Sequence, residues 1–149
     1  MPYLITLDTL AIIPRSENSI VIESDKELIV DETPLEILSR NCQLNGSTLE
    51  GRQKGSSYLT GSSYKPPILL NEINNLIFIP THSIRNKECV WVSLNNILNY
   101  YPDGNKVEIL FKSYQKVHIN QSYSIFDKQV MRATRLESAL RGRNSKKFL

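Results

Sequence analysis

The sequence predicts an α+β protein with mainly antiparallel short strands, short helices and a long C-terminal helix. Short runs rich in isoleucine and valine are separated by turn residues, which is typical of strands joined as hairpins. Apolar residues recur at helical spacing near the C-terminal end. The 149 residues are enough for a domain with a buried core. We expect one domain over residues 1–141, followed over residues 142–149 by a basic tail of the kind that can be disordered.

In the N-terminal part of the chain we expect three strands followed by a helix. The predicted strands are Leu10–Pro14, Ser19–Glu23 and Glu27–Val30, and the second and third form a hairpin. Thr33-Pro34-Leu35-Glu36 matches a capping box with proline at the first helical position. A short helix should therefore continue to about Arg40, with Leu35 and Leu38 facing the core.

The middle of the chain predicts two more hairpins, a strand and a helix. The hairpins pair Ile68–Leu70 with Leu76–Ile79, and Val107–Phe111 with Gln115–Ile119. Cys89–Val92 is a strand candidate in which Trp91 should be a core anchor. Between these elements, Leu94, Ile97, Leu98 and Tyr101 recur at helical spacing, so a short helix is expected there.

A long helix should close the domain. Ser122 can cap a helix over residues 123–141 whose core-facing residues are Phe126, Val130, Ala133 and Leu140. Lys128, Arg132 and Arg135 are spaced by four and three residues and form a basic flank of the same helix. That flank is either a solvated face or a surface for phosphate.

Residues 46–68, GSTLEGRQKGSSYLTGSSYKPPI, hold four of the six glycines and several basic and tyrosine residues. Such a segment is either a polyanion-binding loop or a disordered linker. Gly51 and Gly55 would permit close backbone approach to a ligand. The glycine spacing resembles a P-loop, but Arg52 and Gln53 replace the lysine and the hydroxyl residue, so nucleotide hydrolysis is rejected.

Charge is distributed unevenly along the chain. The net charge is +3, but residues 1–39 carry two basic residues against eight acids, whereas residues 40–149 carry sixteen basic residues against seven acids. Such asymmetry indicates either a polyanionic partner or a solvated surface with an acidic edge. The density of cations around the glycine-rich segment and before Trp91 favours nucleic acid.

Several function classes are not expected. No run approaches the roughly 18 apolar residues of a membrane helix, so we expect a cytoplasmic protein without membrane association. Cys42, Cys89, His82 and His118 lack the spacing of finger-type metal ligands. We therefore expect no metal, no cofactor and no enzymatic activity, because no catalytic group has a placed partner. Buried hydrophobic roles are expected for both cysteines.

Four collinear segments resemble the ComK family, the competence transcription factors of low-GC Gram-positive bacteria. The family pattern S-C, three residues, G-S-S-Y-x-G-R-x-x-G-T is matched at Cys42, Gly46, Ser47, Gly51, Arg52 and Gly55. Asn41 departs from it. The family's H-K-P-P-I corresponds to Tyr64-Lys65-Pro66-Pro67-Ile68, and its F-P-T-x-S, five residues, C-x-W-I-S corresponds to Ile79–Ser83, five residues and Cys89–Ser93. Y-N-S-F-x-N-Q-V-x-R-T is matched within Tyr123–Arg132, although Lys128 replaces asparagine. The resemblance covers about residues 36–136.

The resemblance implies a transcriptional activator that recognises paired A/T-rich boxes in double-stranded DNA, largely through the minor groove, and regulates competence genes. It implies a homo-oligomer, a dimer or higher on DNA, and nucleoid association. Recognition by a proteolytic adaptor is tied to a C-terminal region that longer members carry.

Two groups of candidate DNA contacts follow. The first comprises Arg52 and Lys54 as phosphate or minor-groove contacts, with Lys65 and Tyr64 beside them and Gly51 and Gly55 allowing close approach. The second comprises Arg85 and Lys87 on the segment before Trp91, and Arg132, which matches the family motif.

Two alternatives remain open. One is a non-activating interaction protein that modulates a longer homologue. The other is a single-stranded nucleic-acid binder that stacks bases on Tyr58 and Tyr64.

Overall fold

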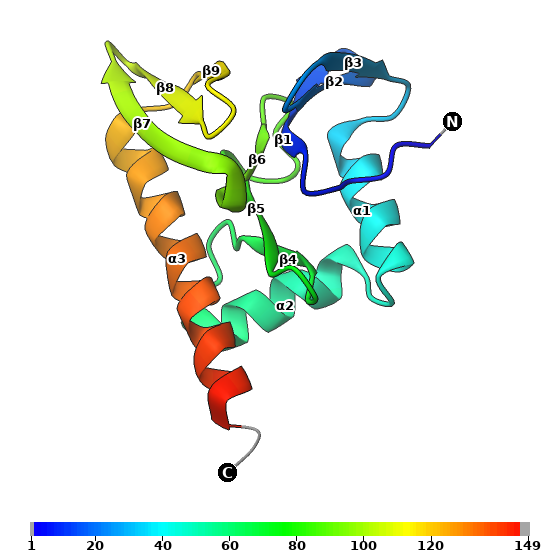
Figure 1. The fold of residues 1–149 in the computed structure, drawn as a ribbon, viewed down its shortest axis with the longest axis vertical. Helices are drawn as coiled ribbons and strands as arrows, with labels where there is room; N and C mark the ends of the chain where they lie inside the picture. The colour runs from blue at the N-terminus through cyan, green and yellow to red at the C-terminus, as the bar shows by residue number, and fades with distance from the viewer. Residues whose placement is uncertain (1, 147–149) are drawn as a thin grey trace.

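A six-stranded antiparallel sheet forms the centre of the computed structural model, which describes residues 2–146 (Figure 1). Its strand order is β3-β2-β1-β6-β5-β4. The strands are β1 (Thr9–Arg15), β2 (Asn18–Glu23), β3 (Glu27–Val30), β4 (Ile68–Asn71), β5 (Leu76–Pro80) and β6 (Trp91–Ser93). Pairing of β1 with β6 joins the N-terminal hairpins to the β4–β5 hairpin.

A second, three-stranded antiparallel sheet has the order β7-β8-β9, with strands β7 (Ile97–Asp103), β8 (Lys106–Phe111) and β9 (Lys116–Ile119). The helices are α1 (Pro34–Leu44), α2 (Leu49–Thr60), the 3-10 turn η1 (Leu94–Asn96) and the long α3 (Tyr123–Lys146). In Figure 1, α3 runs from the small sheet down one side of the molecule, and α2 crosses its lower half. Helix α1 lies on the opposite side, near the N-terminus.

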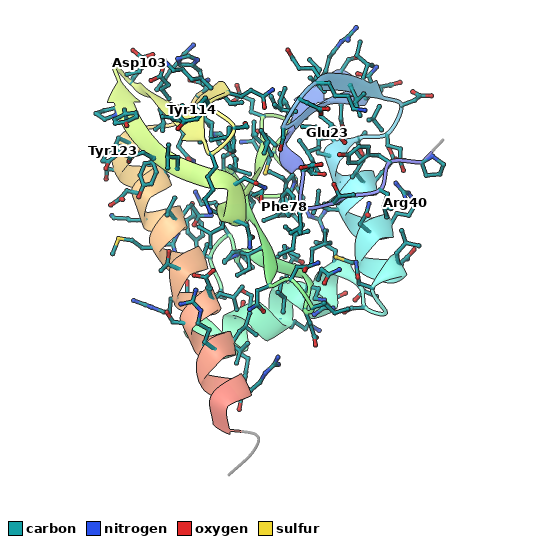
Figure 2. The ribbon with its side chains drawn as sticks, viewed as in Figure 1. Glu23, Arg40, Phe78, Asp103, Tyr114 and Tyr123 are labelled. Carbon is teal, nitrogen blue, oxygen red and sulfur yellow. The ribbon has the colours of Figure 1, made fainter. Side chains whose placement is uncertain are left out.

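Both faces of the large sheet are buried, because alternate residues of a strand point to opposite faces. Ile12, Phe78 and Trp91 face α1 and the N-terminal segment in one apolar cluster, and Figure 2 labels Phe78 in the interior. Their strand neighbours, such as Ala11 and Val92, pack against the small sheet. The other neighbours of Phe78 pack against α3 in a third cluster. The fold is therefore α+β, as predicted.

Most of the expected elements are confirmed. The three N-terminal strands, the two later hairpins, the buried Trp91 and the two buried cysteines lie where the sequence placed them. Thr33 and Glu36 form the capping box of α1, and Ser122 Oγ accepts a hydrogen bond from the Ile125 amide at the start of α3. Helix α3 continues to Lys146, past the expected end at 141, and the rest of the expected tail, residues 147–149, lies outside the described residues.

The helix expected over Leu94–Tyr101 is wrong. These residues form η1 and the first part of β7, which pairs with β8 through a bulge between Ile97 and Asn99. Leu98 and Tyr101 are exposed, so the apolar spacing did not mark one buried helical face. Pairing with β8 outweighs the local pattern, and Pro102 is tolerated because β7 is an edge strand.

The placement of Leu35 in the core is also wrong, since this side chain is 37% exposed. Helix α1 extends to Leu44 and instead buries Ile37, Leu38, Asn41 and Cys42. This buried stripe repeats at four-residue spacing along a helix longer than expected.

The glycine-rich segment is a helix over half of its length, not a loop or a linker. Thr48 caps α2 by accepting a hydrogen bond from the Gly51 amide at 2.9 Å. Gly61 ends the helix in the left-handed conformation, with φ of 73°. Gly51 and Gly55 lie within this helix and not in a loop.

Candidate nucleic-acid interface

A basic hollow of about 550 Å³ lies where three separate segments of the chain meet. The segments are Tyr64–Lys65 before β4, the loop that follows β5, and the beginning of α3. The described residues that line it are Tyr64, Lys65, His82, Ser83, Asn86, Asn120, Gln121, Ser122, Ile125, Lys128 and Arg132. We call this site the basic hollow.

Lys65 is held in a fixed position at the basic hollow. Its backbone has φ of 43°, and its Nζ donates to the Thr81 carbonyl at 3.2 Å. Its own carbonyl accepts from Gln129 Nε2 at 3.1 Å. Partial burial lowers the pKa of Lys65, and the nearby positive charge of Arg132 lowers it further. Lys65 takes part in none of the ion pairs found among the described residues.

The Tyr64 ring lies next to two cations. Lys65 Nζ is 5.1 Å from the ring centroid and Arg132 Cζ is 5.4 Å from it. Both distances are within the range of cation–π attraction. Tyr64 is nevertheless 65% exposed, so the ring and the two cations together present a surface to solvent.

Two buried glutamines form hydrogen bonds with the segments that line the hollow. Gln129, which is fully buried, donates through Nε2 to the Pro80 carbonyl at 2.7 Å as well as to Lys65, and its Oε1 accepts from Arg132. Gln121 Nε2 donates to the Thr81 carbonyl, and its buried Oε1 has no hydrogen-bond partner within the described part of the chain. Gln129 thus connects the segments that carry Lys65 and Arg132.

The electrostatics of the hollow favour an anion. No carboxylate is among the described residues that line it. Lys65, Lys128 and Arg132 also take part in none of the ion pairs found within residues 2–146. The N-terminal end of α3 borders the hollow, has no acidic residue in its first turn and adds the positive end of its dipole. Phosphate is the anion that such a set of donors suits.

Arg52 and Lys54, the first candidates from the sequence, do not line this hollow. The Arg52 side chain is only 14% exposed, and its NH1 lies 3.1 Å from Glu72 Oε1. Lys54 is 77% exposed and lies 3.0 Å from Glu50 on the same helix. Gly51 and Gly55 lie on the same helix, α2.

Arg85 and Lys87 lie on the exposed loop between β5 and β6. They line a second hollow of about 740 Å³, together with Glu17 and Trp91. Asn86 lines both hollows. The loop therefore separates the basic hollow from the second one.

The sequence assigned no site role to Gln121 or Gln129, and it gave Lys128 only as part of a flank that is either a solvated face or a surface for phosphate. A signal for Gln129 was present, because it falls within the last family motif. Three of the four motif segments, at residues 64–68, 79–93 and 123–132, meet at the basic hollow. The first segment, with Arg52, instead packs in α2. Tyr58 on α2 is 87% exposed and does not line the hollow.

Comparison with known proteins identifies the family. The family model described as "ComK protein" matches residues 1–145. The chain belongs to the ComK family. The match also includes the first 35 residues, where the motifs gave little resemblance. The competence transcription factor of Bacillus subtilis (strain 168) is 29% identical over 140 residues, which cover 91% of this chain and 73% of that protein. No solved structure matches.

None of the helices within the described residues is long and apolar enough to cross a membrane. Across the same residues, no three or more histidine, cysteine, aspartate or glutamate side chains are grouped so that they could hold a metal ion.

Proposed function

We propose that this ComK-family protein is a competence transcription factor that activates DNA-uptake genes by binding A/T-rich boxes in duplex DNA. It acts at the nucleoid, reads DNA largely through the minor groove and assembles as a dimer or higher oligomer on its sites. The observation that carries the proposal is the family match over residues 1–145, together with the similarity to a competence transcription factor.

The basic hollow supports the DNA-binding part of this proposal. Its three cations have no carboxylate partner within residues 2–146, so their charge is available to a polyanion. Each phosphate that a protein neutralises adds about 0.9 to the dependence of log affinity on log salt concentration. Contacts from all three cations would contribute a slope of about −3.

The test is a comparison of two duplexes, one with A/T boxes and one rich in G/C, by fluorescence anisotropy over a salt series. We expect tighter binding of the A/T duplex and a steep loss of affinity as salt rises, because the minor groove distinguishes A·T from G·C and A-tracts attract cations there. Equal affinity for both duplexes, or no binding at low salt, would remove this function.

The same experiment distinguishes the alternatives. Preference for a single strand over the duplex would favour a stacking mode on the exposed Tyr58 and Tyr64 rings. Tight duplex binding without activation of a reporter gene would favour a protein that modulates a longer homologue.

A further inference from the structure

We infer that DNA contacts are divided between two neighbouring features: the basic hollow binds a backbone phosphate, and the adjacent loop of residues 83–88 enters a groove with Arg85 and Lys87. We call this loop the ridge. The inference rests on the proposed DNA-binding function and assigns separate roles, affinity and base selection, to residues of the same surface.

Two of the three cations of the hollow are bound to other protein groups, whereas Lys128 is exposed. Arg132 is half-buried and bound to Gln129, and Lys65 is bound through Nζ to the Thr81 carbonyl. A minor groove is about 6 Å wide and about 7.5 Å deep, so a side chain must protrude to read it. A phosphate group protrudes from DNA and fits a concave site. Arg132 and Lys65 therefore suit the backbone and not the base edges.

Two like charges are held together here. Arg132 helps to lower the pKa of Lys65 after the effect of burial, and both cations lie within 5.4 Å of the Tyr64 ring. A bound phosphate would relieve this repulsion and would accept hydrogen bonds from both side chains. Gln129 acts as the positioning residue, because its amide binds Lys65 on one side and Arg132 on the other.

The cationic side chains of the ridge, unlike Arg132 and Lys65, are exposed. Arg85, Asn86 and Lys87 are exposed; Arg85 and Lys87 line the second hollow, and Asn86 lines both hollows. Neither Arg85 nor Lys87 takes part in an ion pair found within residues 2–146. A narrow, strongly negative A-tract groove attracts arginine and lysine side chains of this kind.

Hydrogen bonds within the ridge and to Asn120 hold its backbone in place. The Asn86 amide donates to the Ser83 carbonyl at 2.8 Å, and the Cys89 amide donates to the Asn86 carbonyl at 3.0 Å. Asn86 Oδ1 accepts from the Glu88 amide at 2.8 Å. Glu88 itself accepts from Asn120 at 3.4 Å. A loop ordered in this way loses little conformational entropy on binding.

The two hollows beside the ridge differ in whether a carboxylate lines them. Glu17 lines the second hollow beside Arg85 and Lys87, so a phosphate there would meet a carboxylate. The basic hollow has no such carboxylate among its described lining residues. The phosphate of one strand should therefore bind on the α3 side of the ridge.

The test compares three variants that each remove one positive charge: Arg132→Gln in the hollow, Arg85→Gln on the ridge and Arg135→Gln as the control. Arg135 is exposed, lies three residues after Arg132 on α3 and does not line the hollow. Affinities for the A/T-box and G/C-rich duplexes are measured over a salt series, and melting temperatures establish that each variant is folded.

We expect Arg132→Gln to lower the affinity for both duplexes by the same factor, about fivefold or more at 0.1 M salt. It should also reduce the slope of log affinity against log salt concentration by about 1. We expect Arg85→Gln to lower the ratio of A/T to G/C affinity. Arg135→Gln should change the ratio little and the affinity less than about twofold. The inference is overturned if Arg132→Gln alters the ratio of A/T to G/C affinity or lowers affinity no more than the control does. It is also overturned if Arg85→Gln lowers the affinity for both duplexes equally.

A second measurement separates this inference from the proposed function. Inorganic phosphate is titrated at constant ionic strength while backbone amide signals are followed by NMR. Shifts at Tyr64, Lys65 and Ile125 that disappear in Arg132→Gln and persist in Arg135→Gln support the hollow as a phosphate site. Equal affinity of the unaltered protein for both duplexes would overturn the proposed function and the role of the ridge. Absence of the phosphate shifts would overturn the role of the hollow alone.

Discussion

At the residue scale, Arg52 and Arg132 show how the environment decides what a cation can do. Both match family motifs, so the sequence favoured both as DNA contacts. Arg52 lies largely buried in α2, is paired with Glu72, and its Nε has no hydrogen-bond partner within residues 2–146. Arg132 has no carboxylate partner there and lines the basic hollow. The partner of Arg52 lies 20 residues away in sequence, which only the fold brings close.

We therefore expect Arg52→Ala to affect stability more than DNA binding. It removes a partly buried side chain that packs α2 against the β4–β5 turn, and the loss should be about 1–2 kcal/mol of unfolding free energy. Lys54→Ala is the matched control, because its side chain is exposed and its ion pair with Glu50 should contribute at most about 0.5 kcal/mol. Urea denaturation and duplex affinity are both measured. A tenfold loss of DNA affinity in Arg52→Ala with unchanged stability would instead indicate that Arg52 contacts DNA.

Asn41 illustrates a residue whose departure from the family pattern has a structural reason. Its Oδ1 accepts from the Ile5 amide at 3.0 Å, and its Nδ2 donates to the Tyr3 carbonyl at 3.1 Å. Arg40, its neighbour on α1 and labelled in Figure 2, donates to Glu32 and to the same Tyr3 carbonyl. The hydrogen bond from Arg40 lowers the pKa of Glu32. These contacts hold the N-terminal segment against α1, which the motif alone did not indicate.

At the element scale, the sequence predicted elements well where one local signal dominated. The capping box of α1 and the hairpins carried clear signals and are confirmed. Helix α2 carried signals of its own, Thr48 as N-cap and Gly61 as C-cap, but its glycine and serine content favoured a loop. Its stability comes from packing against α1, α3 and β4, which composition does not show. The basic hollow was unpredictable for the same reason, because distant segments build it.

The two glycines inside α2 give a prediction at this scale. Gly55→Ala should stabilise the protein by about 0.5–1 kcal/mol, because a Cβ there meets no atom within 4 Å and alanine favours the helix. Gly51→Ala should gain less, since its Cβ would lie 3.1 Å from Thr48 Oγ1 and would crowd the helix cap. Melting temperature and urea denaturation test both variants. A marked loss of stability in Gly55→Ala would show that this segment is not helical in solution.

At the scale of the whole molecule, α3 joins the two sheets and the hollow into one structure. Phe126 belongs to the apolar cluster between the sheets, whereas Ala133, Leu136 and Leu140 pack on the β4–β5 side. Gln129 lies between these contacts and supports the basic hollow. The surface proposed to bind DNA is thus built on the same helix that unites the core, so loss of the core should also abolish binding.

The core also holds several acidic groups in their neutral form, which predicts how stability depends on pH. Burial raises the pKa of Cys42 to about 11, and it also raises the pKa of Cys89 and of Tyr3. An unfolded cysteine has a pKa of about 8.5. Between about pH 9 and 11 the unfolded chain has released the Cys42 proton while the folded protein retains it, so rising pH favours unfolding. The stabilisation that Cys42 provides at neutral pH is therefore lost over this range.

We expect the free energy of unfolding in urea to fall as pH rises from about 8 to 11, with Cys42 contributing on the order of 2–3 kcal/mol. Lys65 acts in the opposite direction near the top of this range, because its lowered pKa releases a proton from the folded protein first. Cys42→Ala is the control: it should be less stable at pH 7 because of the cavity it leaves, and its stability should fall less steeply with pH. Equal slopes for the variant and the unaltered protein would contradict a neutral, buried thiol at this position.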